Sequence, residues 1–189
     1  MGNSHAAHWA SEAPTPAQLK EFFAQIESGR VTRSRLQSLL RGESFSDVGL
    51  SILCDGSRKA SQLIKAGGYD WHNDWITDER FPIKKHSSVR KTIEYVTFNH
   101  DPSSEEALEE FRKRGLQRPS YEDALRFGAQ HKEEQRNGPI VFLHEPVLAP
   151  DGSRFVLVLD GGAGLRSLFL GWFDYRWPRG YRVAGVRES

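Results

Sequence analysis

The stretch PIVFLHEPVLAPDGSRFVLVLD, residues 139–160, decides the fold class of this chain. It contains two runs of mostly aliphatic and β-branched residues, and the segment APDG between them has the composition of a turn. Two more such runs, LRSLFLGWF and YRVAGVR, follow the turn-forming segments GGAG and YRWPRG. This spacing predicts that helices end before Ile140 and that an antiparallel β-meander follows.

The residues before this stretch predict one clear strand and several helices. Residues 88–100, SVRKTIEYVTFNH, alternate in polarity and are β-branched, as expected of a strand. Helices are indicated at 57–68, 101–115 and 118–138, each with a serine cap and a closing glycine. The run VGLSILC, residues 48–54, fits a strand or a buried turn. A sheet of about four or five strands needs helices on one face, so the predicted fold class is α+β, with helices packed on an antiparallel sheet.

The N-terminal part of the chain has a different organisation. Residues 1–13 show no periodicity and predict a flexible leader. The segments 14–29 and 31–42 each combine a threonine cap, an apolar stripe and a terminal glycine, which predicts two helices. Because the link between them is short, we expect an N-terminal helical hairpin over 14–42, followed by an α+β domain over 43–189.

Composition and charge restrict the classes of function. Lysine plus arginine number 26 and aspartate plus glutamate 25, so no overall field attracts nucleic acid or an acidic membrane. Cys54 is the only cysteine, which excludes an internal disulfide and a cysteine-based zinc site. No apolar run approaches the ~20 residues needed to cross a bilayer. These features predict a cytoplasmic protein with no cofactor and no membrane partner.

Four blocks of the sequence resemble a family of small bacterial proteins that recurs in genomes of candidate phyla. They are YDWHNDWIT at 69–77, RGLQRPSYEDAL at 114–125, QRNGPIVFL at 135–143 and GWFDYRWPRGYRVAGVR at 171–187. The resemblance extends from about Pro16 to Arg187 and implies a bacterial origin. The family has no established activity, so the resemblance carries over no functional residue. His72, Asn73 and His144 depart from its pattern.

Aromatic and arginine residues concentrate in the loop from Tyr69 to Trp75 and in the segment from Trp172 to Arg182. Outward-facing rings interleaved with arginine are typical of protein-binding hot spots and of platforms for single-stranded nucleic acid. We expect a non-enzymatic protein-binding or adaptor surface that combines the loop with the outer face of a C-terminal hairpin. Nucleic-acid binding through that hairpin is an alternative, and a purely structural hairpin is another. The candidate binding residues are Trp71, Trp75, Arg176, Trp177, Arg179 and Arg182.

A metal-dependent or hydrolytic enzyme is a further alternative. His72, Asp74 and His100 supply the imidazole and carboxylate groups that a metal or a general base requires, with Asp70 close by in the sequence. The sequence contains no H-E-x-x-H, G-x-S-x-G or paired-cysteine motif. The enzyme hypothesis therefore rests on these three residues alone, and the catalytic residues stay unidentified.

Overall fold

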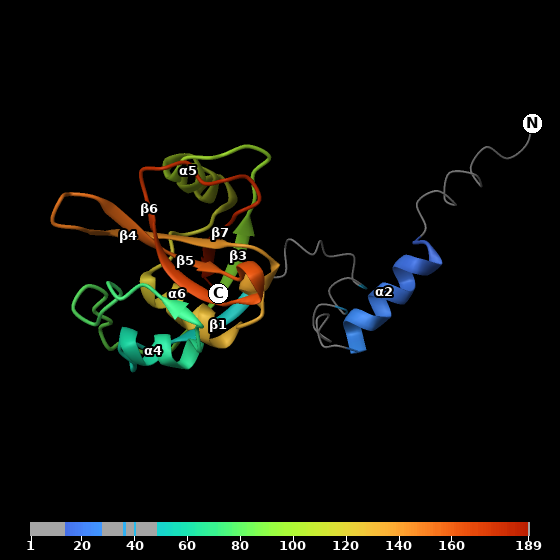
Figure 1. The fold of residues 1–189 in the computed structure, drawn as a ribbon, viewed down its shortest axis with the longest axis horizontal. Helices are drawn as coiled ribbons and strands as arrows, with labels where there is room; N and C mark the ends of the chain where they lie inside the picture. Colours follow the sequence, from blue (N-terminus) through green and yellow to red (C-terminus); the bar gives the residue numbers. More distant parts are fainter. Residues whose placement is uncertain (1–13, 28–35, 37–39, 41–48, 189) are drawn as a thin grey trace, which may run out of the picture. The chain divides into compact units, whose positions relative to one another are not determined.

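The computed structural model describes residues 14–27, 36, 40 and 49–188 (Figure 1). The chain divides into two units, Met1–Val48 and Gly49–Ser189, which are described separately. In the first unit, helix α2 spans Pro16–Glu27. The Thr15 hydroxyl accepts a hydrogen bond from the backbone N–H of Gln18, at 3.3 Å, and so caps this helix. The predicted leader at 1–13 lies outside the described residues, as does most of the second predicted helix.

The second unit is an α+β body built on a seven-stranded mixed sheet. The strand order is β1-β3-β7-β4-β5-β6-β2. Most neighbours are antiparallel, whereas the pairs β4–β7 and β2–β6 are parallel. Among the described residues, no helix is both long and apolar enough to cross a membrane. The strands are β1 (Leu50–Cys54), β2 (Trp71–His72), β3 (Val89–Val96), β4 (Ile140–Leu148), β5 (Arg154–Asp160), β6 (Ser167–Trp172) and β7 (Arg182–Glu188).

Helices cover both faces of the sheet, not the single face that the sequence predicted (Figure 1). Helices α4 (Ala60–Gly67) and α6 (Tyr121–Gln130) pack on one face, and α5 (Ser104–Arg114) packs on the other. Ile140 of β4 belongs to the first core, and Val141 belongs to the second. Strand β4 therefore begins with consecutive apolar residues, because both of its faces are buried.

The position of β7 differs from the predicted meander. Strands β4, β5 and β6 are successive antiparallel neighbours, but β7 lies between β3 and β4. Residues 173–181 are consequently a crossover from β6 to β7 and not a hairpin turn. Their path is fixed by Trp177, which enters the core beneath α5 and donates its backbone N–H to the carbonyl of Pro102, at 2.9 Å.

Candidate functional site

The structure divides the predicted binding residues between the two faces of the sheet. Trp75 and Trp172 line one hollow. It lies on the same face of the sheet as α4 and α6, at a part of that face that these helices do not cover. Trp71 does not line it. The register of β2 and β6 sets Trp71 beside Ser167, and Ser167 alternates to the opposite face from Trp172. The Trp71 ring is 53 % exposed.

Two residues that the sequence analysis placed on the binding surface, Trp177 and Arg182, are largely buried, which corrects that interpretation. Trp177 is only 5 % exposed, and its Nε1–H donates to Ser104 Oγ at 2.9 Å. The guanidinium of Arg182 lies 4.6 Å from the ring centre of Tyr95 and donates to the carbonyl of Glu134 at 2.6 Å. Trp177 is buried because the crossover packs against the body, and Arg182 is covered because it begins β7, a strand between β3 and β4. A hairpin would have presented both groups to solvent.

Arg176 and Arg179 remain exposed but lie on the α5 side of the sheet. Arg176 Nη1 donates to the carbonyl of Asp101, and the backbone N–H of Arg179 donates to the Asp101 carboxylate, both at 2.7 Å. Asp101 belongs to the loop that leads into α5. The arginines and the Trp75 loop therefore do not form the single surface that we expected.

The loop after β2 carries Trp75 and is held at several points. Asn73 donates its backbone N–H to the carbonyl of Leu168 in β6, at 3.0 Å, and its side chain accepts from the backbone N–H of Trp75, at 2.9 Å. Ile76, the next residue, is buried in the first core. Asp78 then accepts from the backbone N–H of Ser61 in α4, at 2.8 Å. Trp75 is thus presented by an ordered loop with fixed ends.

A row of four aromatic rings borders the hollow, and three of them, Trp75, Phe155 and Trp172, line it. The rings of Trp75 and Phe155 are 6.2 Å apart, those of Phe155 and Trp172 are 5.9 Å apart, and those of Trp172 and Tyr175 are 5.0 Å apart. Trp172 is 48 % exposed. The hollow has a volume of about 610 Å³. Its lining consists of Asn73, Trp75, Ala149, Pro150, Asp151, Phe155, Leu170 and Trp172.

The hollow adjoins an incompletely paired edge of the sheet. Strand β2 pairs with β6 at only two positions, Trp71 with Ser167 and His72 with Leu168. Beyond Leu168, no strand in the described part of the chain pairs with the outer side of β6. Since backbone groups alternate along a strand, the N–H and C=O of Leu170 point outward as those of Leu168 do. This edge can accept another strand.

The described residues that line the hollow are acidic or neutral. Asp151 lines it, and hydrogen bonds from Ser153 hold the pKa of the Asp151 carboxyl below its usual range. Of the described residues that line the hollow, none is lysine or arginine. Arg80 is nearby, with its guanidinium 3.9 Å from the ring centre of Trp75, but it is not a lining residue. The hollow therefore favours apolar or cationic groups over phosphate.

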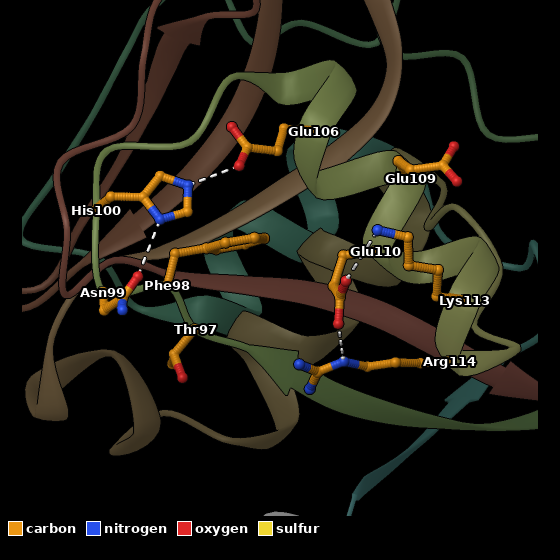
Figure 2. Close-up of a pocket in the computed structure, with 9 residues that line it drawn as sticks. All are labelled: Thr97, Phe98, Asn99, His100, Glu106, Glu109, Glu110, Lys113 and Arg114. Carbon is orange, nitrogen blue, oxygen red and sulfur yellow. Dashed lines mark hydrogen bonds and ion pairs between the residues drawn. The ribbon is translucent and has the colours of Figure 1, made fainter.

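His100 lies in a different hollow, of about 630 Å³, between the end of β3 and α5 (Figure 2). Its Nε2 is 2.6 Å from Glu106 Oε1, and its Nδ1 is 3.0 Å from the Asn99 amide oxygen. Figure 2 also shows Glu110 bound by Arg114, at 2.8 Å. His100, Glu106, Glu110, Lys113 and Arg114 are paired within this hollow, and Glu109 pairs with Arg112 outside it, as on a solvated helix face.

The structure does not bring the three predicted metal ligands together. His72 and Asp74 are exposed at the β2 edge, whereas His100 follows β3, and four strands lie between β2 and β3 in the sheet. Within 14–27, 36, 40 and 49–188, no three His, Cys, Asp or Glu side chains gather as a metal site would require. The arrangement on which the metal hypothesis depended is absent from these residues.

The buried titratable groups around α6 are structural. Asp123 accepts from Cys54 Sγ at 3.3 Å and from Lys91 Nζ at 2.9 Å, and Glu122 lies 2.8 Å from His86 Nε2. Burial and the Asp123 carboxylate raise the pKa of the Cys54 thiol. The thiol is therefore a protonated donor that helps to fix α6 against β1, and not a nucleophile.

His144 has a similar structural role in β4. Regular pairing between β4 and β5 is interrupted after Phe142, and there the backbone N–H of Leu157 donates to His144 Nε2, at 3.0 Å. Arg118 donates to the carbonyl of His144, at 2.8 Å. The buried imidazole replaces a backbone acceptor that the irregular strand no longer provides. Burial lowers the pKa of His144 from 6.5 to about 4, so the ring is neutral at pH 7.

Of the lining residues, sequence reasoning named only Trp75 as a binding residue. Trp172 marked the start of the proposed segment but was not itself a candidate, and Phe155, Leu170 and Asp151 were missed. Phe155 lies in the continuous apolar run of β5 and shares its face with the buried Leu157 and Leu159, so its sequence context is that of a core residue. Its partial exposure arises because α4 and α6 do not extend to this end of the strand. Of the three missed residues, only Asp151 could have been recognised as exposed from the sequence, because it lies in the APDG turn between β4 and β5.

Comparison with known proteins gives no match, since no family model, curated protein or solved structure is significantly similar to this chain. The resemblance of the four sequence blocks stays a prediction. The function is therefore derived from the site.

Proposed function

We propose that this chain is a non-enzymatic protein-binding module. It receives an extended segment of a partner along the outer edge of β6, and one side chain of that segment enters the aromatic hollow. The observation that supports this most strongly is the juxtaposition of a half-exposed aromatic row with a strand edge that is unpaired beyond Leu168. On the sequence evidence alone, we also propose that the protein is bacterial and cytoplasmic, with a helical hairpin at 14–42.

The strand edge supplies affinity that does not depend on the partner's sequence. A segment that continues the line of β2 would exchange backbone hydrogen bonds with Leu170, next to the bond that Asn73 already makes to Leu168. In this mode alternate side chains of the added strand point to the same face. One of them would then meet Trp172 and Phe155, and this contact would select the partner.

A protein segment suits the hollow better than nucleic acid does. Nucleic-acid platforms combine stacking rings with cations for the phosphates. Here Trp177, one of the rings that the sequence offered for stacking, is buried, and the lining includes Asp151 with no described lysine or arginine. Binding of single-stranded DNA that weakens steeply with salt would favour the alternative.

The test begins with selection of random peptides displayed on phage against the full chain. The best peptide is then titrated into the wild-type protein and into two variants. Trp172→Ala should weaken binding by about tenfold or more, as for a hot-spot residue. Leu148→Ala is the matched control: Leu148 is 66 % exposed on the same β4–β5 hairpin but alternates to the other face from Val147, the residue paired with Phe155. It should leave the affinity unchanged.

The mode of binding is tested by the peptide backbone. N-methylation of every second amide removes donors on one edge of a strand only. One of the two N-methylated series should abolish binding and the other should retain it. Equal tolerance of both series, or affinity that Trp172→Ala leaves intact, would contradict the proposal.

A further inference from the structure

We infer that the side chain received by the aromatic hollow is cationic: an alkylammonium group, such as that of a lysine or methylated lysine in the partner segment. This inference rests on the proposed function and specifies the chemistry of the same site. It depends on three features of the hollow: its rings, its carboxylate and the cation that already contacts one of its walls.

The rings provide several faces to one position. Trp75 and Phe155 meet at an interplanar angle of 67°, and Trp172 lies beside Phe155 at 36°. The three rings therefore do not form a flat platform but border the hollow on more than one side. The face of an aromatic ring carries partial negative charge, and tryptophan is the strongest of the aromatic residues in attracting cations.

The carboxylate adds a full charge of the same sign. Asp151 lines the hollow from the turn between β4 and β5, and the lowered pKa of its carboxyl keeps it ionised near neutral pH. No described lining residue neutralises it there. A cation that enters is therefore attracted by the rings and by Asp151 together, whereas a neutral group of equal size gains only apolar contact.

One wall of the hollow already holds a cation within this structure. The Arg80 guanidinium lies 3.9 Å from the ring centre of Trp75. Because Arg80 is not among the lining residues, it leaves the hollow itself to a ligand. The contact shows that the Trp75 ring already packs against a cation in this structure.

A matched pair of small probes tests the charge requirement. Choline and 3,3-dimethyl-1-butanol have the same shape, and they differ in carrying a quaternary nitrogen or a quaternary carbon. Each is titrated at constant ionic strength into the ¹⁵N-labelled full chain, and the indole Nε1–H signals of Trp75 and Trp172 are followed. The signals are assigned with Trp75→Phe and Trp172→Phe. The buried Trp177, bonded to Ser104, is the internal control.

Choline should shift the Trp75 and Trp172 signals and bind about 5- to 30-fold more tightly than the neutral alcohol, with Trp177 unmoved. Asp151→Asn should reduce that ratio. Equal affinities, or no shift of either signal by choline, would overturn the cation inference. Neither result would affect the strand-addition test above, which uses backbone N-methylation and does not depend on charge.

A second pair identifies the source of the cation. The N-acetyl methylamides of lysine and trimethyl-lysine should both shift the two indole signals, with the trimethylated compound binding more tightly. Binding of choline without binding of either lysine compound would overturn the assignment to a partner's side chain and indicate a free quaternary amine.

Discussion

Trp172 and Trp177 are five residues apart in the sequence, and replacement of each by alanine should give very different losses of stability. Trp177 is 5 % exposed and its ring packs on Gly171, where an added Cβ would lie 2.6 Å from the indole. Its removal should cost about 3–5 kcal/mol, the usual loss for truncation of a buried aromatic residue. The Ser104 hydroxyl also loses its donor.

Trp172→Ala should cost only about 1–2 kcal/mol, because half of its ring is already in water and no enclosed cavity is left behind. Both values follow from urea unfolding monitored by circular dichroism, with Trp177→Phe as the variant that keeps a smaller aromatic ring and loses the N–H. The reasoning would be refuted by similar losses for Trp172→Ala and Trp177→Ala. Such a result would mean that the crossover between β6 and β7 does not fill the core beneath α5.

Two further predictions concern buried polar side chains. The pKa of His144 is lowered from 6.5 to about 4, so its stabilising effect is complete above pH 6.5 and is lost as pH falls toward 4. Between about pH 7 and pH 4 the unfolding free energy of the wild type should fall by about 3 kcal/mol more than that of His144→Gln, and equal slopes would contradict this. Arg166→Met should cost about 3 kcal/mol or more, because all five guanidinium N–H groups are hydrogen-bonded, among them to the carbonyls of Gly67, Gly68 and Gly128. Arg166→Lys should recover little of the lost unfolding free energy in the same assay, because one ammonium group cannot replace the five donors of the planar guanidinium.

The local part of the fold could be predicted from the sequence, and the α+β class is confirmed. Apolar, β-branched runs and turn composition identified β4, β5, β6 and β7, because both signals lie within a few neighbouring residues. Strand order could not be obtained in this way. The segment YRWPRG has the composition of a turn, yet it crosses from β6 to β7, because β7 pairs with β3 and β4 instead of with β6.

The residues of the site show the same difference between local signals, which a sequence carries, and burial by distant elements, which it does not. Trp75 was predicted because several aromatic residues gather in the short loop from Tyr69 to Trp75. Trp177 was placed wrongly, since burial in a connection without periodicity is set by what packs against it, here α5. Phe155 was missed because it lies in a continuous apolar run typical of a core strand, whereas the helices that cover the rest of its face end before it.

The central claim is that the outer edge of β6 and the adjacent hollow receive an extended segment of a partner protein. Hydrogen exchange of the full chain, with and without the phage-selected peptide, measures this most directly. The peptide should slow exchange at residues 169–172 and in the turn at 149–153, while residues 97–114 around His100 are unaffected. Protection confined to 97–114, with residues 169–172 unchanged, would contradict the claim.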